Sequence, residues 1–199
     1  MGGQVCYRIH PFSQEMPDRI HPAHPDIAKV LLTERQIKAR IAELGSQISR
    51  DYEGRSLTMV SILKGSVIFL GDLMRAVSTD CSVDFIGLSS YSGTKSSGVV
   101  RLTLDLRENP EGKDILIVED IVDTGLTLRY LLDNFKTRGP RSVETCSFLN
   151  KPSCRKVSVP VKYVGFDIPN EFVVSFGLDL NERFRNLPYV GVMRPNGGK

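Results

Sequence analysis

From residue 57 onward, short apolar runs that end in turn residues alternate with longer stretches of helical periodicity. The runs predict strands and the longer stretches predict helices. Strands are expected at residues 57–63, 83–88, 115–118, 143–149 and 163–166, and helices at residues 67–76 and 126–135. In Ile115-Leu116-Ile117-Val118 every position is apolar, which indicates a central parallel strand covered on both faces. We therefore predict an α/β fold with an open, mostly parallel, twisted sheet flanked by helices.

The chain before residue 57 divides into an irregular arm and a helix. Residues 1–30 hold all three histidines and several prolines, which favours an irregular segment. Thr33, with Gln36 three residues later, has the pattern of a capping box that begins a helix. Apolar residues then recur at helical spacing, at Ile37, Ile41, Leu44 and Ile48.

The charge balance, the cysteine spacing and the length of the apolar runs indicate which classes of protein are excluded. The 199 residues include 26 basic and 23 acidic side chains, a near balance that argues against a general nucleic-acid binder. The four cysteines lack the spacing of a zinc or redox motif, so we expect incidental thiols in a reducing compartment. The chain shows neither a signal-peptide pattern nor an apolar run long enough to span a bilayer. We expect a cytoplasmic protein with neither nucleic acid nor a membrane as a partner.

The strongest chemical signal follows the predicted strand at residues 115–118. Glu119 and Asp120 come at its carboxyl end, where open α/β sheets bind ligands. A short loop with Gly125 then leads into the first turn of the next helix, where unpaired amides can hold a phosphate. Hydroxyls at Thr124 and Thr127 add donors, and the two acids suit a ligand with vicinal hydroxyls and a shared magnesium ion. The chain has neither a Walker A loop nor a dinucleotide fingerprint.

This segment resembles the phosphoribosyl-pyrophosphate motif of type I phosphoribosyltransferases, and residues 57–193 resemble the hypoxanthine-guanine members of that family. The resemblance implies the type I phosphoribosyltransferase fold as a single domain over residues 1–199. Its core would cover about residues 33–170. A small hood would be formed by the N- and C-terminal segments, about residues 1–32 and 171–199.

The resemblance also implies roles for the residues around the motif. Glu119 and Asp120 would hold the ribose hydroxyls, directly or through Mg²⁺ and water. The loop from Asp123 to Thr127, with Thr124, Gly125 and Leu126 between them, would bind the 5′-phosphate. Asp123 would also face N7 of the purine as the catalytic residue.

Further roles fall on flanking loops. The resemblance assigns pyrophosphate to the Lys64-Gly65 loop, with a cis peptide before Lys64, and to Arg185. Many relatives have glycine where this chain has Ser66. Residues 89–98 would form a lid, with Ser90 and Tyr91 closing over the pyrophosphate to exclude water.

The base and the metal complete the implied site. Lys151 would point at O6 of the purine, because an ammonium group has three donors and no acceptor and so disfavours the 6-amino group of adenine. Phe172 would stack on the purine, and the backbone of Val173 would pair with its edge. Asp179 would be a ligand of Mg²⁺ on the pyrophosphate side.

The implied activity is Mg²⁺-dependent transfer of the phosphoribosyl group from phosphoribosyl pyrophosphate to N9 of hypoxanthine, guanine or both. The products would be IMP or GMP and pyrophosphate, in purine salvage by a homodimer or homotetramer. Alternatives are a xanthine, adenine or pyrimidine phosphoribosyltransferase, or an RNA-binding regulator of the same fold. The set Lys151, Phe172, Asp179 and Arg185 argues against the adenine and pyrimidine enzymes. The sequence contains no run of four or more Lys or Arg residues, which argues against the RNA-binding regulator.

Overall fold

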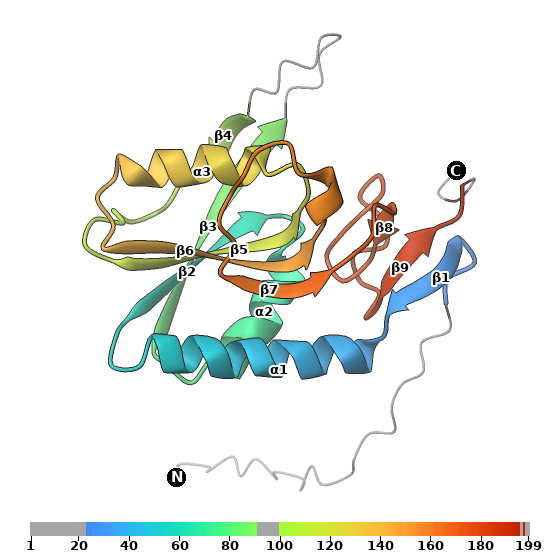
Figure 1. The fold of residues 1–199 in the computed structure, drawn as a ribbon, viewed down its shortest axis with the longest axis horizontal. Helices are drawn as coiled ribbons and strands as arrows, with labels where there is room; N and C mark the ends of the chain where they lie inside the picture. Colours follow the sequence, from blue (N-terminus) through green and yellow to red (C-terminus); the bar gives the residue numbers. More distant parts are fainter. Residues whose placement is uncertain (1–22, 91–99, 196, 198–199) are drawn as a thin grey trace, which may run out of the picture.

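The computed structural model describes residues 23–90, 100–195 and 197 and contains two sheets (Figure 1). The elements in chain order are β1 (Ile27–Leu32), α1 (Glu34–Asp51), β2 (Leu57–Leu63), α2 (Val67–Ala76), β3 (Cys81–Ser90), β4 (Val100–Leu104), β5 (Asp114–Val122), α3 (Leu126–Lys136), β6 (Ser142–Asn150), the 3-10 turn η1 (Pro152–Cys154), β7 (Tyr163–Asp167), β8 (Val173–Val174) and β9 (Val190–Met193). The strands and helices predicted from residue 57 onward are confirmed. So is the capping box of Thr33 and Gln36 at the beginning of α1.

The larger sheet has six strands in the order β4-β3-β2-β5-β6-β7. Neighbours from β3 to β7 are parallel, and β4 is antiparallel to β3 at the edge. Strand β5 lies between β2 and β6, with Ile117 opposite Val60 on one side and Thr145 on the other. The predicted open, mostly parallel sheet is therefore confirmed.

Helices cover both faces of this sheet, which explains the uninterrupted apolar run in β5. Leu116 and Val118 belong to the core cluster shared with α1 and α2, whereas Ile115 and Ile117 belong to the cluster under α3. Figure 1 shows α1 and α2 on one side of the sheet and α3 on the other. Because successive side chains of a strand point to opposite faces, a strand covered on both sides requires apolar residues at consecutive positions.

The smaller sheet, in the order β1-β9-β8, corrects one prediction. Residues 27–30 were expected in an irregular arm, but they belong to β1, and Ile27 is buried against Val174, Tyr189 and Met193. The strand is paired with β9 near the other end of the chain, so no local pattern specifies it. This sheet lies beyond the carboxyl ends of β5, β6 and β7 (Figure 1). It is made by segments assigned to the hood, and the single-domain division stays a prediction.

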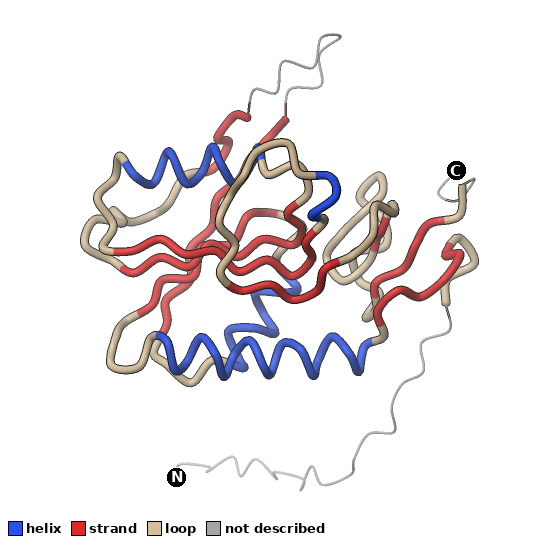
Figure 2. Tube along the Cα trace, viewed as in Figure 1, coloured by secondary structure: helices blue, strands red, loops and turns tan. Residues whose placement is uncertain are grey.

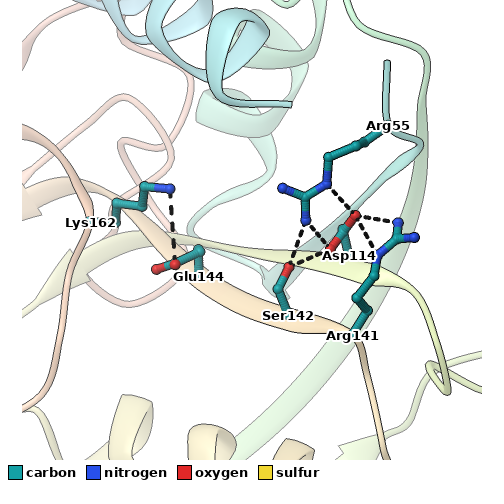
Figure 3. Close-up of polar contacts among 6 residues, drawn as sticks. All are labelled: Arg55, Asp114, Arg141, Ser142, Glu144 and Lys162. Atoms are coloured by element: carbon teal, nitrogen blue, oxygen red, sulfur yellow. Dashed lines mark hydrogen bonds and ion pairs between the residues drawn. The ribbon is translucent and has the colours of Figure 1, made fainter. Parts of the chain in front are cut away.

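At the opposite edge of the large sheet, where β5 begins, the buried carboxylate of Asp114 is held by several hydrogen bonds (Figure 3). Asp114 is fully buried at the beginning of β5 and accepts hydrogen bonds from Arg55 Nε at 2.9 Å, from Arg141 Nε at 3.0 Å and from the Ser142 hydroxyl. Burial by itself raises the pKa of Asp114, but the hydrogen bonds from Arg141, Arg55 and Ser142 outweigh it and lower that pKa. The carboxylate is therefore ionised at neutral pH and joins β5 to β6 and to the chain before β2.

Candidate active site

The carboxyl ends of β2, β5 and β6 meet at one edge of the sheet and deliver the predicted site residues there. Lys64 follows β2, Asp123 follows β5 and Lys151 follows β6. The backbone N–H of Lys151 donates to the carbonyl oxygen of Val122 at 3.0 Å, so two of these strand ends are in direct contact. A pocket of about 280 Å³ lies at this edge, lined by Glu119 to Gly125, Thr127 and Leu128. Its position is where open α/β sheets bind ligands.

Glu119, which is buried, and Asp120, which is half-buried, form an acidic pair in this pocket. Burial, together with the neighbouring charge of Asp120, raises the pKa of Glu119 well above its ordinary value. Burial likewise raises the pKa of Asp120 to about 6, against an opposing hydrogen bond from the backbone of Ile121. Oε2 of Glu119 is buried and has no hydrogen-bond partner among the described residues. A buried carboxylate oxygen without a partner needs a donor or a cation, which a ligand can supply.

Gly65 brings the loop after β2 against this acidic pair. A Cβ atom built on Gly65 would lie 1.6 Å from Oδ2 of Asp120, so a larger residue cannot occupy the position without displacing the carboxylate. The peptide between Leu63 and Lys64 is cis, as the resemblance implied. Ser66, which replaces the glycine of many relatives, is buried, and its hydroxyl donates to the carbonyl oxygen of Ile62 at 2.6 Å. The serine is therefore accommodated inside the loop.

The loop between β5 and α3 has the geometry of an anion cradle. Gly125 is the N-cap of α3 with φ of +83°, a left-handed conformation that favours glycine. A Cβ on Gly125 would also lie 2.8 Å from the carbonyl oxygen of Val157. Among residues 23–90, 100–195 and 197, the only side chain that caps the first turn is Thr124, whose hydroxyl accepts a long hydrogen bond of 3.4 Å from the Leu126 N–H. The amides of Leu126 and Thr127 are thus available to an anion.

A second segment holds this cradle in place, and no sequence pattern pointed to it. Arg155 donates from Nη1 to the carbonyl oxygen of Asp123 at 2.8 Å and from Nη2 to the side-chain oxygen of Asn150. The backbone N–H groups of Lys156 and Val157 donate to the carbonyl oxygen of Thr124 at 3.0 and 3.2 Å. Figure 2 shows the connection between η1 and β7 passing beside the beginning of α3. Loop residues 123 and 124 are therefore fixed by residues 155–157.

Two of the predicted pyrophosphate residues, Lys64 and Arg185, lie close to Asp179 and Glu182. Arg185 Nη1 donates to the carbonyl oxygen of Gly177 at 2.8 Å, and Nη2 lies 2.9 Å from Oδ1 of Asp179. Lys64 and Arg185 both pair with Glu182, a residue that the sequence analysis did not single out. Ser90 ends β3, and residues 91–98 of the predicted lid, Tyr91 among them, lie outside the described residues.

The predicted base residues lie beside one another at the junction of the two sheets. The buried Lys151 donates from Nζ to the carbonyl oxygen of Glu171 at 2.8 Å, next to Phe172. Val173 is buried in β8, whereas Phe172 is 57% exposed. An exposed aromatic ring beside a buried lysine has a free face on which a planar base can stack.

The acids of the site suit a cation that takes part of its coordination from a ligand. Among the described residues, no three His, Cys, Asp or Glu side chains converge into a ready-made metal centre. Mg²⁺ is usually held by one or two carboxylates together with water and substrate phosphates. The pair Glu119 and Asp120 fits that requirement, because a buried oxygen of Glu119 has no hydrogen-bond partner within the described part of the chain.

Comparison with known proteins agrees with this geometry. Residues 28–181 match the family described as the phosphoribosyl transferase domain, so the chain belongs to the phosphoribosyltransferase family. Within it, the chain is 49% identical over 194 residues to the hypoxanthine-guanine phosphoribosyltransferase of Mycobacterium avium, covering 91% of this chain and 96% of the relative. The enzyme of the same name from Mycobacterium tuberculosis is 51% identical over 177 residues, covering 85% and 88% of the two chains.

Solved structures show the same likeness. A hypoxanthine phosphoribosyltransferase from Staphylococcus aureus matches with a TM-score of 0.82 and 46% identity, over 85% of this chain and 93% of that chain. The hypoxanthine phosphoribosyl transferase of Trypanosoma cruzi matches with a TM-score of 0.83 and 40% identity, over 88% and 95% of the two chains. The predicted family and fold class are confirmed.

Proposed function

We propose that the protein transfers the phosphoribosyl group of phosphoribosyl pyrophosphate to N9 of hypoxanthine, guanine or both, in purine salvage. The observation that carries the proposal is the acidic pair of the buried Glu119 and the half-buried Asp120 beside a glycine-capped helix start. This pairing suits a sugar that carries both hydroxyls and a phosphate. The relatives named hypoxanthine-guanine phosphoribosyltransferase support the choice of base.

The proposed reaction is a substitution at C1′ of the ribose. The bond from N9 to C1′ forms as the bond from C1′ to pyrophosphate breaks, and the electron pair leaves with pyrophosphate. Asp123, at the end of β5, takes the proton released by the purine or stabilises the base at N7. The cradle at residues 123–127 holds the 5′-phosphate, so catalysis depends on position and charge rather than on a covalent intermediate.

The proposed cofactor is Mg²⁺, with Glu119, Asp120 and Asp179 as the acids that hold it directly or through water. When bound, the ion neutralises the charge that develops on the leaving pyrophosphate. Lys64 and Arg185 lie on the same side of the site and contribute positive charge there. Ser90 and Tyr91 are proposed to close over the pyrophosphate.

Specificity for a 6-oxopurine is proposed to come from Lys151, Phe172 and Val173. Lys151 Nζ is fixed by the carbonyl oxygen of Glu171, so its remaining donors have a defined direction. A donor at this place matches O6 and opposes the 6-amino group of adenine.

The proposed setting is a homo-oligomer in the cytoplasm. Cys81, Cys146 and Cys154 are free thiols, which suits a reducing compartment. Within the described ranges, no helix combines the length and apolar character needed to cross a bilayer. Val67, Ile68 and Met74 are exposed apolar residues on α2, a feature that favours association. The molar mass from light scattering distinguishes a monomer, a dimer and a tetramer.

A direct assay tests the proposed function. The protein is incubated with phosphoribosyl pyrophosphate, Mg²⁺ and, separately, hypoxanthine, guanine, xanthine, adenine or a pyrimidine base. Formation of IMP or GMP with release of pyrophosphate is the expected result. A product with adenine or a pyrimidine alone would overturn the base assignment, and no product with any base would overturn the activity.

A further inference from the structure

Glu182 joins the two cations that the proposed function assigns to pyrophosphate. Its Oε1 lies 3.2 Å from Nζ of Lys64, and its Oε2 lies 3.1 Å from Nη2 of Arg185. A single carboxylate therefore offers one oxygen to each cation, as two oxygens of a bound phosphate group could do. Lys64 follows β2 and Arg185 precedes β9, so this contact bridges distant parts of the chain.

The backbone around Glu182 is arranged to present this side chain. Glu182 has φ of +62°, in the left-handed region that is uncommon for residues other than glycine. Its N–H donates to Oδ2 of Asp179 at 2.8 Å, and Leu180 pairs with Arg183 across the turn. Arg185 is held separately by the carbonyl oxygen of Gly177 and by Asp179. The turn thus persists through contacts that do not involve the Glu182 carboxylate.

The ion pairs of Glu182 with Lys64 and Arg185 are weak enough to be replaced by contacts with another anion. The Glu182 side chain is 64% exposed, and ion pairs between solvent-exposed groups are weak. Its two oxygens contact Lys64 and Arg185 separately, so each contact can be exchanged for one to another anion. Pyrophosphate, which carries several negative charges, is able to compete for the same two cations.

We propose that Glu182 is an internal counter-ion that competes with the pyrophosphate group for Lys64 and Arg185. This inference rests on the proposed function. The carboxylate weakens the binding of phosphoribosyl pyrophosphate and of free pyrophosphate. It also returns to the two cations as the product leaves, which speeds release.

The test is pyrophosphate binding to the full chain carrying Glu182→Gln. Glutamine keeps the size of the side chain and removes its charge, so inorganic pyrophosphate should bind roughly three- to tenfold more tightly, with a gain that shrinks as salt is added. Isothermal titration calorimetry, with and without Mg²⁺, measures the dissociation constant. The control is Glu108→Gln, which removes the same charge from an exposed ion pair with Lys113 outside the site and should change nothing.

Two further variants separate this inference from the proposed function. Lys64→Met and Arg185→Met should each weaken pyrophosphate binding. If both bind it like the parent protein, the pyrophosphate assignment itself is wrong. If they weaken binding while Glu182→Gln leaves affinity equal or lower, only the counter-ion role is overturned. The gain from Glu182→Gln should also diminish in the Lys64→Met background, a coupling that a purely structural role for Glu182 does not produce.

Discussion

Asp123 is the residue on which the proposed chemistry depends most directly. Its replacement by Asn keeps the shape of the side chain but removes a base that can accept the purine proton. We expect Asp123→Asn to lower kcat by about two to three orders of magnitude, as the loss of one preorganised electrostatic contact does. Steady-state kinetics with hypoxanthine measures the effect. A kcat within a few-fold of the parent value would contradict the role of Asp123 as the catalytic residue.

Lys151 carries the predicted discrimination between 6-oxopurines and adenine. Lys151→Gln supplies an acceptor as well as donors, so a 6-amino group no longer meets donors alone. A mismatched polar group can produce a selectivity on the order of 10⁴. We expect the selectivity of Lys151→Gln for hypoxanthine over adenine to be lower than that of the parent by at least about tenfold. The ratio of kcat/KM for the two bases is the measurement. Lys156→Gln, at an exposed position in the same segment, is the control and should keep the parent ratio.

Single residues differ in how far the sequence could predict them. The site acids and the glycine of the cradle could be proposed because they follow an apolar strand in a recognisable order. Glu182 and Arg155 could not, because each is one charged residue in an irregular stretch. Their contacts are made with residues that the fold brings together from elsewhere, such as Lys64 for Glu182 and Asp123 for Arg155.

At the scale of elements, the connection between η1 and β7 acts on the loop between β5 and α3. Arg155→Met removes two hydrogen bonds that fix this loop while leaving the substrate-facing groups unchanged. We expect KM for phosphoribosyl pyrophosphate to rise about tenfold, because a loosened cradle must be ordered on binding. Arg155→Lys keeps the charge and one possible donor and should recover part of the affinity.

A matched control separates this positioning role from general stability. Arg194 also donates to a backbone carbonyl oxygen, that of Pro25, but it follows β9 of the smaller sheet. Arg194→Met should leave KM for phosphoribosyl pyrophosphate unchanged. An equal rise in KM for both variants, or no rise for Arg155→Met, would contradict the role of Arg155.

The elements themselves were predictable where their pattern is local. Each strand and helix that was predicted from residue 57 onward has its own apolar run or periodicity and its own turn residues. The six residues of β1 follow prolines and have no clear pattern of their own. They form a strand only because β9, more than 150 residues later in the chain, pairs with them. Sequence periodicity therefore predicts the five parallel strands of the large sheet and misses its antiparallel edge strand β4 as well as β1 and β9 of the small sheet.

At the scale of the whole molecule, Asp114 is expected to govern stability in acid. Its pKa is lower in the folded protein than in the unfolded chain, so its contribution is complete above the unfolded pKa, near 3.9, and is lost as pH falls through the folded pKa. Asp114→Asn removes a buried, charge-assisted hydrogen-bond acceptor and should lower the free energy of unfolding by about 2 kcal/mol at pH 7. The difference from the parent should shrink below about pH 4.

Urea unfolding at pH 7 and at pH 3 measures this dependence. Asp133→Asn is the control, since it breaks an exposed ion pair with Lys136 and should have little effect at either pH. A difference between the parent and Asp114→Asn that stays the same at both pH values would show that the ionised carboxylate is not responsible.

The pKa of the acid at the beginning of β5, Asp114, is lowered, whereas the pKa values of the acids near its end, Glu119 and Asp120, are raised. Glu119 and Asp120 have raised pKa values, so the free protein keeps part of its site acids neutral near pH 6. Ligands that favour the ionised carboxylates then expel hydrogen ions into the surrounding solution. The observed heat of binding should accordingly vary with the ionisation enthalpy of the buffer, and the slope gives the number of hydrogen ions expelled per site.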